Sequence, residues 1–266
     1  MLDRVLIHQS PWWLLIGTCF VFFAGMSAAA RFAVRRVTSA DRQDQVTDYA
    51  TKTLGPIGTT FAFLIGFAAT MTWSAMNAGQ EAVDAQATSA QQLAWATKSI
   101  ADKTGAAQVI GNLDRYLTAA AEEDPKFLAV GDATGLPSAQ AFDTLQHSVH
   151  NVAYSKQTTA AEANAMTLAA AALTTAQAKV AAVSQRSLPG LMTGLLVASG
   201  ALLAVVMGVA AAEVVRPYLM YGWALVLAIA MALVLTLDVP FGGGIRVNMR
   251  PMVDVSDNLV AEPLDK

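Results

Sequence analysis

Residues 187–238 read SLPGLMTGLLVASGALLAVVMGVAAAEVVRPYLMYGWALVLAIAMALVLTLD and contain two long uncharged stretches. The first stretch covers about 187–212 and the second about 217–237, where Asp238 ends it. Each supplies the roughly 20 apolar residues that an α-helix needs to cross a bilayer. Because only Glu213 to Arg216 lie between them, the sequence predicts two membrane helices joined as a hairpin.

The N-terminal part of the chain carries two further stretches of this kind, at about 11–30 and 55–78. Trp12, Trp13 and Trp73 stand near their ends, and such aromatic side chains favour the headgroup region. The first stretch ends in small residues and could instead be a signal peptide, although the arginines from Arg31 onward favour a membrane anchor. The fold class predicted is therefore all-α, with four transmembrane helices.

Composition excludes several classes of protein. The chain is 55% hydrophobic and 14% charged, whereas soluble proteins average about 25% charged residues. Its net charge of −3 gives no positive excess for binding nucleic acid. We find no phosphate-binding loop, Gly-x-Ser-x-Gly elbow or His-Glu-x-x-His motif. We therefore expect no enzymatic activity, no cofactor and no nucleic-acid partner, with the lipid bilayer as the first partner.

The predicted membrane cores contain no Asp, Glu, Lys, Arg or His. Ionisable groups inside a membrane mark proton relays, voltage sensors and coupled transport. Their absence from these four stretches argues against those functions and leaves a passive pore, a structural bundle or a sensor.

Residues 81–186 form the large polar region, which we predict to be helical and to lie outside the membrane between the second and third spans. The second span continues into an 80–103 helix without a turn signal. A helix over about 158–187 carries a heptad seam from Met166 to Val183 and would be roughly 45 Å long. It leads to Pro189, which marks a kink or the start of the third span. We treat 1–80 as an N-terminal membrane hairpin, 187–238 as a C-terminal one and 239–266 as a tail.

Lys and Arg in the short loops predict the orientation of the chain. Residues 31–54 contain five of them, and Arg216 lies on the same side. The opposite side carries Arg4 and the cations of the tail. This count favours a cytoplasmic 31–54 loop, with both termini and residues 81–186 outside.

Several short motifs occur in a fixed order along the chain: Gly66-Phe67, Glu81-Ala82, the Tyr116 to Asp124 segment, the Arg186 to Pro189 entry, and the Pro240-Phe241-Gly242-Gly243 turn. Their order resembles the bestrophin-like family of bacterial four-pass membrane proteins, long catalogued as a domain of unknown function. The resemblance covers nearly the whole chain, although the Trp that often follows the acidic end of the Tyr helix is replaced by Pro125-Lys126-Phe127.

The resemblance implies a four-pass protein of the bacterial inner membrane. By analogy with true bestrophins, which are pentameric anion channels, it also implies an oligomeric ion channel. True bestrophins keep both termini in the cytoplasm, which is opposite to the orientation that the charge count favours.

The second span is the best candidate for lining a pore, because aromatic side chains can form constrictions that gate by dewetting. The candidates are Thr59, Phe63, Phe67 and Thr70, and the alternative is that they face lipid and neighbouring helices. Beyond this span, Glu81 and Asp84 could form an acidic ring in an oligomer, or they could merely keep a helix surface soluble.

Other residues support packing or weaker site hypotheses. Small residues let membrane helices approach closely, either within one chain or between subunits. They occur in the third span at Gly190, Gly194, Gly200, Ala204 and Gly208. The Pro240 to Gly243 turn is expected to fold the tail back at the membrane surface. Asp143, His147 and His150 share a helix face and are weak candidates for zinc, where a solvated polar face is the commoner explanation.

Two functions remain open on these observations. The preferred one is an oligomeric ion channel or pore. The alternative is a membrane-anchored sensor or interaction protein whose 81–186 helices bind a partner, with a dimer formed through the Met166–Val183 seam.

Overall fold

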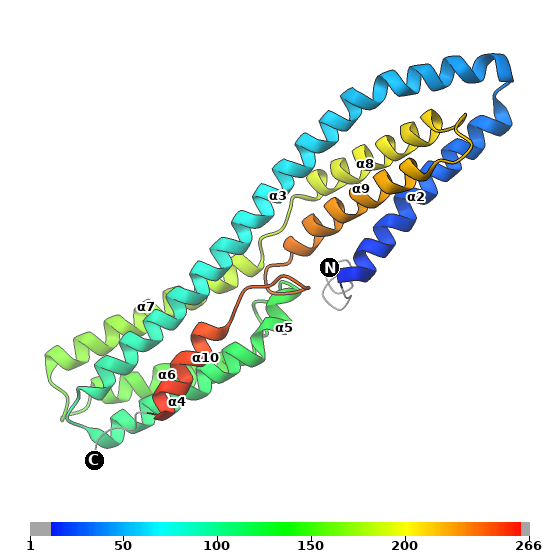
Figure 1. The fold of residues 1–266 in the computed structure, drawn as a ribbon. Coiled ribbons are helices and arrows are strands. Elements are labelled where there is room, and N and C mark those ends of the chain that lie inside the picture. Colours follow the sequence, from blue (N-terminus) through cyan, green and yellow to red (C-terminus); the bar gives the residue numbers. More distant parts are fainter. Residues whose placement is uncertain (1–11, 262–266) are drawn as a thin grey trace. The chain divides into compact units, whose positions relative to one another are not determined.

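The computed structural model describes residues 12–261, and every regular element between these bounds is an α-helix (Figure 1). Pro11, Arg4 and the last five residues, with the predictions that involve them, lie outside the described residues. The helices are α2 (Trp12–Val37), α3 (Ala40–Lys98), α4 (Lys103–Glu122), α5 (Asp124–Ala129), α6 (Ser138–Ala153), α7 (Ala160–Ser184), α8 (Gly190–Ala210), α9 (Tyr218–Leu237) and α10 (Arg250–Ala261). The chain divides into two compact units, which are described separately below.

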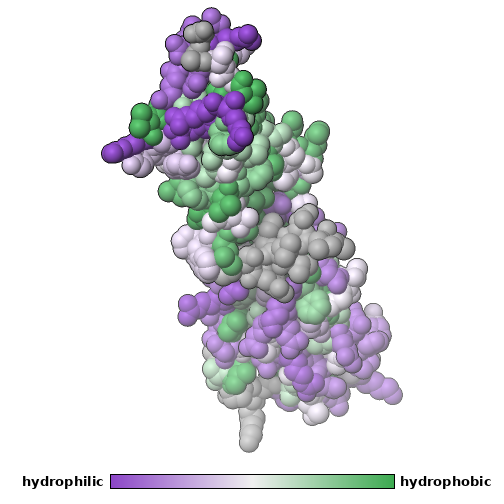
Figure 2. Space-filling view, turned by 90° about the vertical axis from the view of Figure 1, so that its right-hand side faces the viewer, coloured by the Kyte–Doolittle hydropathy of each residue, from purple (hydrophilic) through white to green (hydrophobic). Residues whose placement is uncertain are grey.

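The first unit, the membrane unit, comprises residues 12–74 and 187–238 of the described chain. In it α2 packs on both α8 and α9, and the membrane part of α3 adds Phe61 and Ala68 to the same apolar core. Trp13 and Trp223 are exposed near helix ends, and Trp73 is exposed within α3. Figure 2 shows apolar side chains gathered over this unit, as expected of helices that face lipid.

The α8–α9 turn is fastened by two arginines of α2. The Arg31 Nε donates to the Ala211 carbonyl over 3.1 Å, and the Arg35 guanidinium donates to the Ala212 and Val214 carbonyls. Arg31 also donates to Val214. The last carbonyls of a helix have no partner within it and carry partial negative charge, so cations stabilise them. The connection over residues 211–217 is thereby held against α2.

The predicted loop over residues 31–54 is helical for most of its length. The α2 helix continues to Val37, and after a turn at Thr38 and Ser39 the α3 helix begins at Ala40. The prediction stopped α2 at its arginines because they are charged, but these side chains find carbonyl partners and the backbone stays helical. The α3 helix starts 15 residues before Gly55 and contains Pro56, and the bounds of the second membrane span stay a prediction.

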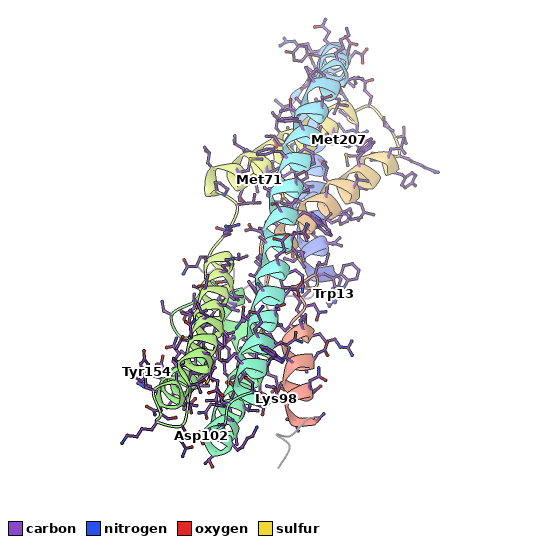
Figure 3. The ribbon with its side chains drawn as sticks, turned by 90° about the vertical axis from the view of Figure 1, so that its left-hand side faces the viewer. Trp13, Met71, Lys98, Asp102, Tyr154 and Met207 are labelled. Atoms are coloured by element: carbon purple, nitrogen blue, oxygen red, sulfur yellow. The ribbon has the colours of Figure 1, made fainter. Side chains whose placement is uncertain are left out.

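The α3 helix is 59 residues long and continues without a break from the membrane unit into the second unit, as the missing turn signal predicted. It ends at Lys98, shortly before Asp102, and both residues are labelled in Figure 3. Asp102 then caps α4 by accepting a hydrogen bond from the Gly105 N–H over 2.9 Å. Such a cap satisfies one of the four free N–H groups at a helix start.

Among residues 12–261, five helices are long and apolar enough to cross a membrane: α2, α3, α7, α8 and α9. Four correspond to the predicted spans, while α7 was predicted to lie outside the membrane. Its Met166, Leu173 and Val180 are buried in the core of the second unit. The count of four transmembrane helices stays a prediction.

The second unit, the helical unit, comprises residues 75–186 with 239–261 of the described chain. Here α4 packs on α6 and on α10, and α6 packs on α7. The whole Met166–Val183 seam of α7 is buried within this one chain. The seam is therefore occupied by the chain's own core, and the predicted dimer through it is wrong.

The core of the helical unit contains two buried polar links. The Gln86 amide of α3 donates to the Tyr116 hydroxyl of α4, and burial raises the pKa of Tyr116 above its usual range. The Asp124 carboxylate, at the start of α5, accepts from the Ser138 N–H over 3.1 Å and from its hydroxyl. Burial raises the pKa of Asp124 against the opposing effect of these hydrogen bonds.

The tail joins the helical unit through the predicted turn. Phe241 is buried in the core, Gly243 has a positive φ of 72°, and the Val247 N–H donates to the Pro240 carbonyl over 2.8 Å. The chain then enters α10, which the sequence analysis did not predict. Met252, Val255 and Leu259 form its buried face, and their 3–4 spacing was a readable helix signal.

Candidate functional site

The membrane part of α3 has one covered face and one open face. Phe61 and Ala68 are buried against the other membrane helices, whereas Thr59, Phe63, Phe67 and Thr70 are all exposed. Phe63 retains 71% of its surface and Phe67 retains 52%. The structure thus places all four predicted pore-lining residues on the uncovered side of α3.

The threonines on this open face satisfy their hydroxyl groups within the helix. The Thr59 hydroxyl donates to the Gly55 carbonyl and the Thr70 hydroxyl to the Gly66 carbonyl, each over 2.9 Å. Because the donor proton is used, each oxygen presents only acceptor capacity outward. The open face therefore combines two aromatic rings with weakly polar acceptors and carries no charge.

Beyond the membrane part, α3 exposes the two predicted acidic residues. Glu81 and Asp84 lie on its open side, while Ala82 and Val83 enter the core of the helical unit. Asp84 accepts a hydrogen bond from the Gln80 amide over 2.9 Å. An acidic ring formed by these carboxylates from several copies stays a prediction.

The small-residue stripe of α8 splits into two parts. Gly200 lies against Phe23 and Phe61, and an added Cβ at Gly208 would lie 2.1 Å from the Ser27 carbonyl oxygen. Ala204 accepts a hydrogen bond from the Ser27 hydroxyl over 2.8 Å. These three positions are packed within the chain. Gly190 and Gly194 instead meet no atom within 4 Å, so only they remain available to a neighbouring subunit.

The structure does not assemble the weak metal candidates. Asp143, His147 and His150 are exposed on α6, and the His150 ring contacts the Tyr154 ring in a tilted arrangement with centroids 4.6 Å apart. Within residues 12–261, no group of three His, Cys, Asp or Glu side chains is placed to hold a metal ion.

Sequence reasoning missed a contact between the tail and α3. The Asn248 N–H donates to the Gln80 side-chain oxygen over 2.9 Å, and the Gln80 amide donates back to the Asn248 carbonyl over 3.3 Å. An added Cβ at Gly79 would lie 2.8 Å from a Val247 methyl carbon, so only glycine lets the tail approach this closely. In the sequence, a glycine (Gly79) followed by a polar residue (Gln80) is the feature that could have indicated this contact.

A family model described as the Bestrophin-like domain matches residues 21–252, which include most of α2, all of α3 to α9, the tail turn and the start of α10. The chain belongs to the bestrophin-like family. Comparison with curated proteins gives no match. The match to the family model confirms the family resemblance that the sequence motifs predicted. This bestrophin-like chain is a multi-pass membrane protein.

Solved structures show the same fold. A bacterial bestrophin homologue from Klebsiella pneumoniae, phased with zinc, aligns with a TM-score of 0.70 and 12% identity, covering 92% of this chain and 97% of that one. A point variant of the Klebsiella pneumoniae homologue gives 0.71 and 12%, covering 92% and 98%. A further structure, described as a membrane protein, gives 0.72 and 12%, covering 94% and 98%. At such identities the likeness establishes the fold alone.

Proposed function

We propose that this bestrophin-like protein assembles as a homo-oligomer and forms an ion channel lined by the open face of α3. The observation that carries the proposal is the division of α3 in the membrane unit. Its apolar residues cover α2, α8 and α9, while Thr59, Phe63, Phe67 and Thr70 are left uncovered on the other side. A ring of copies around an axis would bring these faces together.

The chemistry of the open face suits passive conduction. Residues 53–80 of α3 contain no ionisable side chain, so a pore along them holds no fixed charge to relay protons. Phenylalanine rings from several copies would form an apolar constriction, which water leaves readily when the pore narrows. Non-enzymatic passive transport is therefore the function that this face supports.

The proposed channel would present Glu81 and Asp84 at the end of its membrane segment. Rings of carboxylates attract cations and repel anions. If these residues lie near the axis, the channel of this protein would be more selective for cations than true bestrophins, which are anion channels.

Reconstitution in planar bilayers tests the channel. Phe67→Ala is expected to raise single-channel conductance, because it removes an aromatic ring from the constriction. Phe32→Ala is the matched control, since Phe32 is also an exposed phenylalanine, at 62%, but belongs to α2 and not to α3. Equal conductance of the two variants, or silence of the wild-type protein and both variants, would refute the pore.

We further propose the bacterial inner membrane as the location, with the α2–α3 turn in the cytoplasm and both termini outside. Two of the five cations in 31–54, Arg31 and Arg35, also cap α8, so they have a structural role besides topology. Labelling of Ser39→Cys or Lys156→Cys in a Cys19→Ser background decides the orientation. In intact cells an impermeant maleimide is expected to label position 156 only, and labelling of position 39 alone would reverse the assignment.

A further inference from the structure

The helical unit contains a cavity of about 490 Å³ between the α4–α5 junction and the tail. This volume falls within the range of roughly 300–1,000 Å³ typical of small-molecule sites. Phe241 forms part of its wall. All the residues that line the cavity belong to one compact unit.

Charged residues line this tail cavity with an excess of cations. Lys126, Arg246 and Arg250 contribute three positive charges, and Glu122 contributes one negative charge. All four side chains are exposed, so their charged ends are open to a ligand from solvent. Guanidinium groups bind phosphate with paired hydrogen bonds, which makes two arginines and a lysine a suitable set for a phosphate-bearing anion.

The backbone adds little to this set. The Arg250 N–H at the start of α10 is already bonded to the Asn248 side-chain oxygen over 3.0 Å, and Pro251 has no N–H. The free N–H groups that make other helix starts attractive to anions are thus reduced here. The side-chain cations therefore carry the argument.

The cavity is directly connected to the acidic part of α3. Asn248 lines the cavity, and its backbone exchanges two hydrogen bonds with Gln80. The Gln80 amide also donates to Asp84. A ligand that repositions the tail at Asn248 would therefore act on the residue that holds Asp84.

We propose that the tail cavity binds a small phosphate-bearing anion and that its occupancy regulates conduction through the Asn248–Gln80–Asp84 connection. The binding claim stands on the cavity alone, while the effect on conduction rests on the proposed channel. The phosphate could belong to a soluble metabolite or to the headgroup of an anionic lipid.

Isothermal titration of the purified full chain with inorganic pyrophosphate tests binding at near-physiological ionic strength. The double variant Arg246→Gln with Arg250→Gln is expected to weaken binding about tenfold or more, since two charge-assisted contacts are removed. The charge-matched control changes Lys156 and Lys179 to Gln, both exposed outside the cavity. Glu122→Gln should tighten binding, which a folding defect could not imitate.

Dihexanoyl phosphatidic acid in a parallel titration identifies the source of the phosphate. Competition with pyrophosphate assigns the cavity to a lipid headgroup, and binding of pyrophosphate alone assigns it to a soluble anion. Absence of binding by both probes, or equal affinity of the two double variants, would overturn the site. Bilayer recording with pyrophosphate tests the regulation separately, since unchanged conductance despite measured binding overturns only the coupling. A silent protein that still binds pyrophosphate counts against the channel and leaves the site standing.

Discussion

Replacing Gly208 by alanine tests the packing of α8 on α2 within the membrane unit. The new Cβ would lie 2.1 Å from the Ser27 carbonyl oxygen and 2.8 Å from the Ser27 carbonyl carbon. Both atoms belong to backbone and cannot rotate away. Real Cβ contacts essentially never fall below 3.0 Å, so the two helices must separate locally by about 1 Å.

The cost follows from three contributions. Overpacking in a well-packed region costs about 1–3 kcal/mol. Separation also strains the 2.8 Å hydrogen bond from the Ser27 hydroxyl to Ala204, and such interhelical bonds average about 0.6 kcal/mol in membranes. The higher helix propensity of alanine offsets roughly 0.5–1 kcal/mol of this loss of stability. We expect a net loss of about 1–3 kcal/mol in the free energy of unfolding.

Thermal unfolding in detergent, followed by tryptophan fluorescence, measures this loss. A 2 kcal/mol change corresponds to a fall of roughly 4–8 °C in Tm for a chain of this size. Gly194→Ala is the matched control on the same helix, because its added Cβ meets no atom within 4 Å. Its Tm should stay level or rise slightly. Equal Tm values for the two variants would refute the α2–α8 contact.

Three further expectations follow, two of them from the helical unit. The double variant Glu81→Gln with Asp84→Asn should shift the reversal potential toward greater anion permeability. An unchanged reversal potential would contradict the acidic-ring hypothesis. Because burial raises the pKa of Asp124, its contribution to stability is complete below its ordinary pKa of about 3.8 and is lost as pH rises through the raised folded value. Wild-type stability relative to Asp124→Asn should therefore decline as pH rises above about 4 in chemical denaturation, and a constant difference would contradict the raised pKa. Cysteine labelling at positions 39 and 156 reports orientation, as described above.

Much of the fold could be predicted because hydrophobic length is a strong signal for membrane helices. The bounds of α8 and α9 fall within a few residues of the predicted spans. The ends of α2 and α3 were missed, since charged residues such as Arg31 were assumed to end a span. Arg31 instead donates hydrogen bonds to carbonyls some 180 positions away, and no local pattern encodes that pairing.

The candidate site was predictable only in part. A helical repeat identifies which residues share one face of α3, but it does not tell which face the other helices cover. Similarly, the spacing of Gly200, Ala204 and Gly208 indicated close packing without identifying Ser27 as the partner. The tail cavity brings Lys126 and Arg246 together from distant parts of the chain, so it needed the tertiary structure.

Single-particle imaging of the detergent-solubilised protein tests the central claim, that the open face of α3 lines a pore between subunits. We expect a closed ring of copies with Thr59, Phe63, Phe67 and Thr70 facing an axial opening. A monomer, a dimer without an axial opening, or a ring with these four residues turned toward lipid would contradict it.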